Sequence, residues 1–600
     1  MKSRRDFLVR TPLALLGLLA AWKLKAQATN PKDVPGATPA FNTGAGTGPE
    51  VTQRTFAEAG KLMQVGMSEA QREQAASSWR TAMAGTMERR VGPRRITLEE
   101  GLAPATVWNP ELPGHVVGPT HDRFQPAPID AGPLPARDVD IAFASVAKLG
   151  QWIRTRKLTS EHLTKIYLAR IKRFDPKLRC VITLLEDHAI TQARQADREI
   201  AAGHYRGPLH GIPWGVKDLL DTAGIRTTYG AAPFRNRVPT EDSTVVKRLS
   251  AAGAVLVAKL SMGALALNDI WFGGQTMNPW VPEEGSGGSS AGPGSATAAG
   301  LVAFAIGSET QGSIIDPAMR CGVTGLRPTF GRVPRSGAMT LCWSLDKLGP
   351  LARTVEDTML VLQAISGPDA GDVASVPSHL DYNASVPVKG LKVGYFPAWM
   401  KEPPATSVDR AALQTLHELG LRPTPVSLPD WPYDSLNVML FAEAAAAFEE
   451  LTLSGKDDEM KVQTSDAWPN LFRESRFLSA VDFVQADRMR RKVAQEMARL
   501  MSGVDLLLVP SLRNEMLIIA NNTGQPSLTL RTGFVRISQA RSDWAPDPAH
   551  PLPRFDPPRR VPYGVTLIGR LFDEGTIARV GLAMERKLKV AQERPPGFET

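Results

Sequence analysis

The sequence is poor in cysteine, with three in 600 residues: Cys180, Cys321 and Cys342. None belongs to a C-x-x-C pair, and so few cysteines form neither a zinc site nor a disulfide framework. We therefore expect three buried thiols, without a structural metal and without covalent links between segments.

The sequence also lacks, at its N-terminus, an apolar run of the roughly 20 residues that span a bilayer. The run TPLALLGLLAAW (11–22) is shorter, follows the basic stretch MKSRRDFLVR and precedes the small residues Ala26-Gln27-Ala28. This order predicts an export signal over residues 1–28, and the pair Arg4-Arg5 resembles the Tat type. An uncleaved anchor is the alternative. We expect an exported protein, periplasmic or secreted, with no stable membrane span after cleavage.

A concentrated basic stripe is missing once the leader is set aside. The chain carries a formal charge of +9, but six basic residues and one acid lie within residues 1–28, which leaves +4. Nucleic-acid binding loses its main support, because it needs a clustered basic face. The remaining composition, 43% hydrophobic and 22% charged, is that of an ordinary globular protein.

Residues 29–137 have the texture of an appended arm. Residues 29–50 are rich in proline, glycine, alanine and threonine, residues 51–90 predict two helices, and residues 101–137 are irregular. Ser68 is a candidate N-cap for the second helix. No catalytic pattern occurs in this arm.

From residue 138 to residue 600 the pattern changes to helices alternating with short apolar strands, which indicates an α/β domain. The segments 161–174, 188–203 and the start of 243–260 predict helices, whereas 180–185, the end of 243–260 and 505–511 predict strands. The proline-rich stretch 544–562 interrupts the pattern and predicts a surface loop.

The main candidate for chemistry is the cluster GSGGSSAGPGS (285–295), followed by SETQGSI (308–314). No lysine follows these glycines, which excludes a phosphate-binding loop. A linker is disfavoured because the cluster leads into ATAAGLVAFAI (296–306), a small apolar stretch expected to form a buried helix. Ser290 fits the nucleophile-elbow pattern G-x-S-x-G, but the preceding NPWVPEEG does not predict the strand that an elbow requires.

A serine nucleophile needs a base, and a desolvated neutral lysine can serve. Lys217, in LHGIPWGVKDLLDTAG (209–224), directly follows an apolar run. The residues alone leave open an ordinary surface lysine here, and turn or helix-cap roles for the serines. Trp214 is expected to pack against the sheet.

Taken together these stretches resemble the amidase signature family. The matching blocks occur in order: LHGIPWGVKD, GSGGSSAGPGS with IGSETQGSI, CGVTGLRPTFGRV, GPLARTVED, DLLLVPS, NNTGQPSLTL and YGVTLIGRLFDE. The resemblance covers about residues 138–590. It implies a large twisted mixed β-sheet surrounded by α-helices, here with an N-terminal helical extension.

The resemblance further implies a Ser–cis-Ser–Lys triad. The lysine corresponds to Lys217, the bridging cis-serine to Ser289 and the nucleophile to Ser313. The implied oxyanion hole consists of the backbone N–H groups of Thr310, Gln311, Gly312 and Ser313. The implied activity is hydrolysis of a linear amide C–N bond through a serine acyl-enzyme, with no metal and no organic cofactor.

The chain departs from the family pattern around the nucleophile, where Gln311 replaces a glycine and Ile315 an arginine. Glu309 thereby loses its expected partner. The nearest cation in sequence is Arg320, so we expect an ion pair between Glu309 and Arg320; the alternative is that both reach solvent.

Three functions agree with these residues: an exported amidohydrolase of small amides, the catalytic component of a glutamyl-tRNA amidotransferase, and a non-catalytic binding protein. An export signal argues against the second. Ester or carbamate cleavage and a homodimer are left open by the sequence.

Overall fold

The computed structural model describes residues 35–98, 110, 112, 115 and 117–599. The predicted export signal at 1–28 lies outside the described residues, as do the first residues of the arm and most of 99–116.

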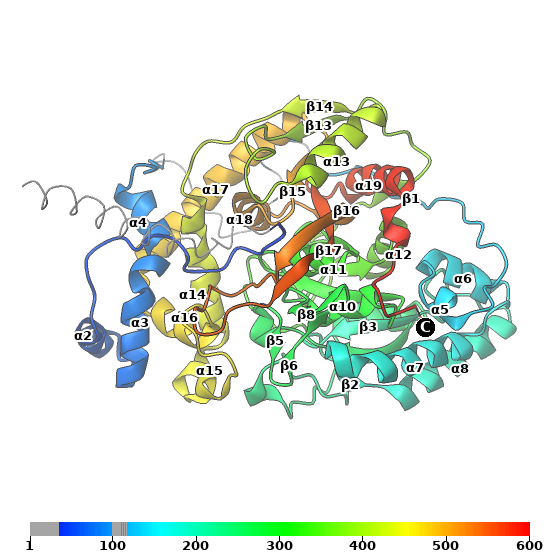
Figure 1. Cartoon of the computed structure of the whole chain (residues 1–600), viewed down its shortest axis with the longest axis horizontal. Coiled ribbons are helices and arrows are strands. Elements are labelled where there is room, and N and C mark those ends of the chain that lie inside the picture. Colours follow the sequence, from blue (N-terminus) through cyan, green and yellow to red (C-terminus); the bar gives the residue numbers. More distant parts are fainter. Residues whose placement is uncertain (1–34, 99–109, 111, 113–114, 116, 600) are drawn as a thin grey trace, which may run out of the picture.

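The arm contains helices α2 (Gln53–Met63), α3 (Glu69–Ala82) and α4 (Ala84–Val91). Ser68 caps α3, and its hydroxyl accepts from the backbone N–H of Gln71. The single helix expected after Ser68 is thus two helices, separated at Met83. In Figure 1 the arm (blue) lies at one side of the molecule, where α3 packs against α16 (Trp468–Ser475).

The part of the chain that follows the arm is built on one mixed sheet of 11 strands, in the order β14-β13-β15-β17-β16-β10-β11-β9-β3-β4-β2. Their bounds are β2 (Val181–Leu184), β3 (Pro213–Lys217), β4 (Val255–Leu260), β9 (Phe304–Glu309), β10 (Thr324–Arg327), β11 (Lys347–Ala352), β13 (Lys392–Tyr395), β14 (Arg422–Pro425), β15 (Leu506–Pro510), β16 (Ser527–Gln539) and β17 (Arg554–Gly569). Strands β9, β3 and β4 run parallel to one another, whereas β11 is antiparallel to β9. The expected large mixed sheet is confirmed.

Helices surround this sheet (Figure 1). They are α5 (Asp138–Ala142), α6 (Val146–Arg154), α7 (Ser160–Leu178), α8 (Glu186–Ala201), α9 (Thr244–Ala251), α10 (Ala291–Ala298), α11 (Ile315–Cys321), α12 (Val355–Ile365), α13 (Ser407–Glu418), α14 (Asn437–Ala447), α15 (Glu449–Leu453), α17 (Ala480–Gly503), α18 (Asn514–Thr523) and α19 (Glu574–Leu588). Among the described residues no helix combines the length and the hydropathy of a membrane span. Short strands form small pairs outside the main sheet: β1 (Arg123–Gln125) with β12 (Asp381–Asn383), β5 (Ile270–Trp271) with β6 (Gly274–Gln275), and β7 (Met277–Asn278) with β8 (Val281–Gly285).

Two local expectations were wrong. The stretch 296–306 is not one helix, since α10 ends at Ala298 and β9 begins at Phe304. Phe304 and Ile306 are fully buried in β9, which pairs with β3 and β11. The stretch 544–562 is a loop only in its first part, since Arg554 already belongs to β17 and pairs with β16. The three cysteines are buried and free, as expected.

Candidate active site

Lys217 and Glu309 lie at the carboxyl ends of neighbouring strands. Lys217 is the last residue of β3, and Glu309 is the last residue of β9. These strands are parallel, with Val216 opposite Ile306. The carboxyl ends of parallel strands meet at the same edge of a sheet, which is the usual position for a site in an α/β fold.

The glycine/serine cluster meets Lys217 at this edge. Lys217 Nζ lies 2.8 Å from Ser289 Oγ, 2.9 Å from Ser308 Oγ and 3.2 Å from Ser290 Oγ. Ser289 and Ser290 directly precede α10, and the Gly288–Ser289 peptide bond is cis. The structure therefore brings together the lysine and the bridging serine that the sequence singled out. Ser308 is a third partner that the sequence reasoning missed.

The environment of Lys217 favours the neutral amine. Its side chain is fully buried, and burial lowers the pKa of Lys217 well below its usual value, although Asp346 and Glu309 act in the opposite direction. A neutral amine can accept a proton, whereas an ammonium group cannot. Lys217 is thus suited to act as a base.

Ser313 sits in the turn between β9 and α11 and is nearly buried, with 9% of its surface exposed. Its carbonyl oxygen accepts from the backbone N–H of Ser290 at 3.1 Å, which ties the two serine loops together. Among the described contacts, no hydrogen bond links the hydroxyls of Ser289 and Ser313. Ser290 is fully buried, and its hydroxyl donates to the Ser308 carbonyl at 3.0 Å, an arrangement that suits a structural role better than that of a nucleophile.

The turn before Ser313 presents backbone donors. Gly312 has φ +91°, a conformation that favours glycine. Within the described residues, the N–H groups of Gln311, Gly312 and Ser313 meet no hydrogen-bond acceptor, whereas those of Ile314 and Ile315 donate to Glu309. Backbone donors without a partner are available to an oxygen atom of a bound molecule.

Glu309 is held by Arg327 and not by Arg320, so the expected pair was wrong. Arg327 Nη1 donates to Glu309 Oε1 at 2.6 Å, and Asn521 Nδ2 donates to the same oxygen at 2.9 Å. Burial would raise the pKa of Glu309, but Arg327 holds it at about 2. Arg327 lies at the end of β10, and strand pairing brings it behind the turn that contains Ser313, although the two are well separated in sequence.

Arg320 instead forms a separate buried cluster on α11. Its guanidinium lies 2.5 Å from Asp543 and 3.4 Å from Asp316. Asp316 follows Ser313 by three residues, and its Oδ2 accepts from the backbone N–H of Gly288 at 2.8 Å. This cluster therefore reaches the loop that contains Ser289.

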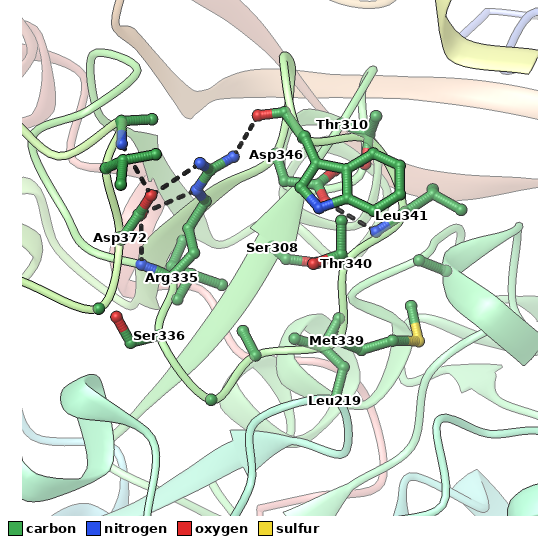
Figure 2. A pocket seen from close by; sticks show the side chains of 18 residues that line it. Leu219, Ser308, Thr310, Arg335, Ser336, Met339, Thr340, Leu341, Asp346 and Asp372 are labelled. Carbon is green, nitrogen blue, oxygen red and sulfur yellow. Dashed lines mark hydrogen bonds and ion pairs between the residues drawn. The ribbon is translucent and has the colours of Figure 1, made fainter. Parts of the chain in front are cut away.

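A cavity of about 380 Å³ adjoins this edge of the sheet. Ser308 and Thr310 form part of its wall, and Figure 2 shows Leu219 and Met339 on another part and the ion pair of Arg335 with Asp372 on one side. The pair has two contacts of 2.9 Å between Arg335 nitrogens and the carboxylate. Thr310 Oγ1 donates to Asp346 at 2.6 Å, which fixes the start of the turn before Ser313 against the cavity.

Trp214 lies on β3, three residues before Lys217. Trp214 is fully buried and stacks on Phe304, with ring centroids 5.9 Å apart, so it packs the sheet as expected. The described residues contain no group of three or more histidine, cysteine or acidic side chains suited to hold a metal ion.

The fold and this edge of the sheet define the class of protein. The solved structure of native peptide amidase from Stenotrophomonas maltophilia is similar, with a TM-score of 0.65 and 28% sequence identity, covering 77% of this chain and 100% of that chain. Two curated sequences are also similar. AmiD of Mycobacterium tuberculosis, a protein to which amidase activity is ascribed, is 34% identical over 488 residues (78% of this chain, 99% of AmiD). A glutamyl-tRNA(Gln) amidotransferase chain of a Roseiflexus species is 34% identical over 481 residues (72% of this chain, 93% of that protein).

The sequence profile of the family described as "Amidase" matches residues 162–577, and the chain belongs to this family. Family, relatives and fold support an enzyme that hydrolyses amide C–N bonds.

Proposed function

We propose that the protein hydrolyses a small carboxylic amide through an acyl-enzyme on Ser313, with Lys217 and Ser289 relaying the proton. The observation that carries this proposal is the contact of 2.8 Å between the buried Lys217 amine and the Ser289 hydroxyl. A neutral lysine beside a serine is a base in position to act.

In the first half of the reaction Lys217 takes the hydroxyl proton of Ser289, and Ser289 takes that of Ser313. Ser313 Oγ then forms a bond to the carbonyl carbon of the amide. The backbone N–H groups of Thr310, Gln311, Gly312 and Ser313 then stabilise the negative charge on the carbonyl oxygen. The proton returns through Ser289 to the amide nitrogen, the C–N bond breaks, and ammonia or an amine leaves.

In the second half water attacks the Ser313 ester along the same proton path, which releases the acid and restores the serine. Every proton transfer uses Lys217, Ser289 or Ser313, so the path needs only side chains of this chain.

The cavity supports an uncharged substrate group. Its wall includes apolar side chains, and its charged residues Arg335 and Asp372 neutralise each other. The third acidic residue of the wall, Asp346, has its carboxylate occupied by hydrogen bonds from Thr310 and from the backbone N–H groups of Leu341 and Cys342. We propose that it receives an aliphatic or aryl part of the amide. Leu219→Phe should then lower kcat/KM for bulky amides more than for acetamide, and equal effects on both would remove the cavity from the substrate path.

The similarity to both amidases and an amidotransferase does not separate these two activities. The twin-arginine pattern at Arg4-Arg5 favours an exported amidase, because export would remove the enzyme from tRNA and from other amidotransferase chains. The test is to incubate the mature protein with aliphatic, aryl and peptide amides and to measure ammonia or amine release. Turnover that is lost in Ser313→Ala supports the proposal, and turnover that is unchanged in this variant contradicts it.

A further inference from the structure

A segment of the N-terminal arm, residues 35–43, crosses the catalytic region; we call it the N-terminal strap. Figure 1 shows the dark-blue chain running from the arm to the middle of the molecule. Gly36 is buried so closely that a Cβ there would lie 2.9 Å from Met319 Cε on α11. Further along, Phe41 packs edge-on against Phe441 of α14, with ring centroids 5.2 Å apart. The strap is therefore part of the packed structure.

Thr38 lies between these two contacts and reaches the Arg320 cluster. Its hydroxyl donates to Asp316 Oδ1 at 2.7 Å and accepts from Arg320 Nη2 at 2.7 Å. One hydroxyl thus uses its donor on a carboxylate and an acceptor lone pair on a guanidinium. This contact joins residues that are 278 positions apart in sequence.

Asp316 connects Thr38 to the two loops that carry Ser289 and Ser313. Its Oδ2 accepts from the backbone N–H of Gly288, directly before Ser289, at 2.8 Å. Its own N–H donates to the carbonyl oxygen of Gly312, directly before Ser313, at 2.8 Å. Asp316 therefore touches both the loop of the bridging serine and the nucleophile turn.

The groups around Asp316 act in opposite directions on its carboxylate, and the hydroxyl of Thr38 is one of those that stabilise the charged form. The groups that act on the Asp316 carboxyl come from several elements: Arg320 of the same helix, Asp543 of the segment between β16 and β17, Thr38 of the strap and Gly288 of the serine loop. The cluster also includes Asp269 before β5, and the pair of Glu284 with Arg541, 2.5 Å apart, lies beside it. Burial raises the pKa of Asp316 well above its usual value, Arg320 opposes this, Asp543 adds to it, and the Thr38 hydrogen bond lowers it.

We propose that Thr38 is a positioning residue for the reaction, which holds Asp316 and through it the Ser289 loop against the Ser313 turn. The N-terminal strap is then a working part of the active site. This inference rests on the proposed function, because it assumes that Ser313 is the nucleophile.

The test measures the rate at which a fluorophosphonate probe labels Ser313 in the full mature chain. This rate needs no knowledge of the natural substrate. Thr38→Val keeps the shape of the side chain but removes the hydroxyl, and we expect labelling to slow by about tenfold, as for a lost hydrogen bond to a charged group. Thr38→Ser keeps the hydroxyl and should label within about twofold of the wild-type rate.

Thr43→Val is the matched control, because Thr43 is exposed on the same strap and its hydroxyl donates only to the Ala40 carbonyl at 3.2 Å. It should label at the wild-type rate. If Thr38→Val does not fold, as judged by its thermal midpoint, the smaller Thr38→Ala replaces it.

The pH profile of labelling separates positioning from simple loss of stability. Loss of the donor to Asp316 disfavours the carboxylate, so the pKa of Asp316 rises; Thr38→Val should therefore lose rate on the acid side in addition to the limb set by Lys217, which both proteins share. Equal rates and equal profiles in wild type and Thr38→Val would overturn the inference while the nucleophile assignment stands. Failure of the wild type to be labelled at Ser313 would overturn the proposed function and, with it, this inference.

Discussion

Arg327 and Glu309 form a fully buried ion pair directly behind the turn that contains Ser313, with 2.6 Å between Arg327 Nη1 and Glu309 Oε1. Glu309 in turn accepts from the backbone N–H groups of Ile314 and Ile315. The pair therefore fixes the backbone on the C-terminal side of Ser313, while the N–H groups of Gln311 and Gly312 have no acceptor among the described residues.

Removing one partner of this pair should be costly. Arg327→Met leaves Glu309 charged and buried, so we expect the free energy of unfolding in urea to fall by about 3–5 kcal/mol. Glu309→Gln combined with Arg327→Met should recover part of the loss. Arg560→Met is the control, because its pair with Glu593 is exposed and should contribute less than about 1 kcal/mol. Additive effects of Glu309→Gln and Arg327→Met would show that the two residues are not coupled.

The depressed pKa of Lys217 predicts the pH dependence of catalysis. The amine must be neutral to act as a base, so kcat/KM should rise with pH through the lowered pKa of Lys217 and then level off. Lys217→Arg should be inactive at every pH, because a guanidinium stays protonated. Lys165→Arg, on the exposed face of α7, should behave as wild type. Retained turnover in Lys217→Arg would contradict this role.

The docking of the arm depends on a buried acid. Ser78 of α3 donates to Glu474 of α16 at 2.5 Å, and burial raises the pKa of Glu474 to about 8. The folded protein then holds a proton that the unfolded chain releases, so Glu474 should make stability fall as pH rises from about 4.5 to about 8. In Glu474→Gln, the free energy of unfolding obtained from thermal melts should fall by a few kcal/mol less across this pH window than it does in the wild type. Glu449→Gln, with an exposed side chain on α15, serves as control, and an unchanged slope in Glu474→Gln would contradict the burial argument.

Export is a prediction from sequence alone. Residues 1–28 fused to a reporter should carry it across the membrane, and replacement of Arg4 and Arg5 by lysine should block this transport, since the Tat route reads the arginine pair. Continued transport of the double-lysine variant would exclude this route, although the general secretory route would remain.

The sequence predicted the contact between Lys217 and Ser289, and it failed for partners that depend on tertiary folding. Lys217 and Ser289 meet as expected, because each lies in a recognisable block. Ser308 was missed because its contact with Lys217 follows from the pairing of β3 with β9. The sequence suggested Arg320 as the partner of Glu309 because Arg320 is closer to Glu309 in sequence than Arg327 is. In the structure Arg320 instead pairs with Asp543.

The fold was similarly readable where periodicity is strong, as in α7 and β15. It was not readable in the proline-rich stretch at 554–562, where β16 imposes an extended conformation on residues with weak strand propensity. Nor could the sequence reveal the strap, because one hydrogen bond between Thr38 and Asp316 leaves no local pattern.

The most direct test of this account is to react the mature protein with a fluorophosphonate and to map the modified peptide by mass spectrometry. We predict one adduct, on Ser313, that is absent from Ser313→Ala and forms much more slowly in Ser289→Ala and Lys217→Met. Labelling of Ser290, or undiminished labelling of Ser313→Ala, would contradict the assignment of the nucleophile.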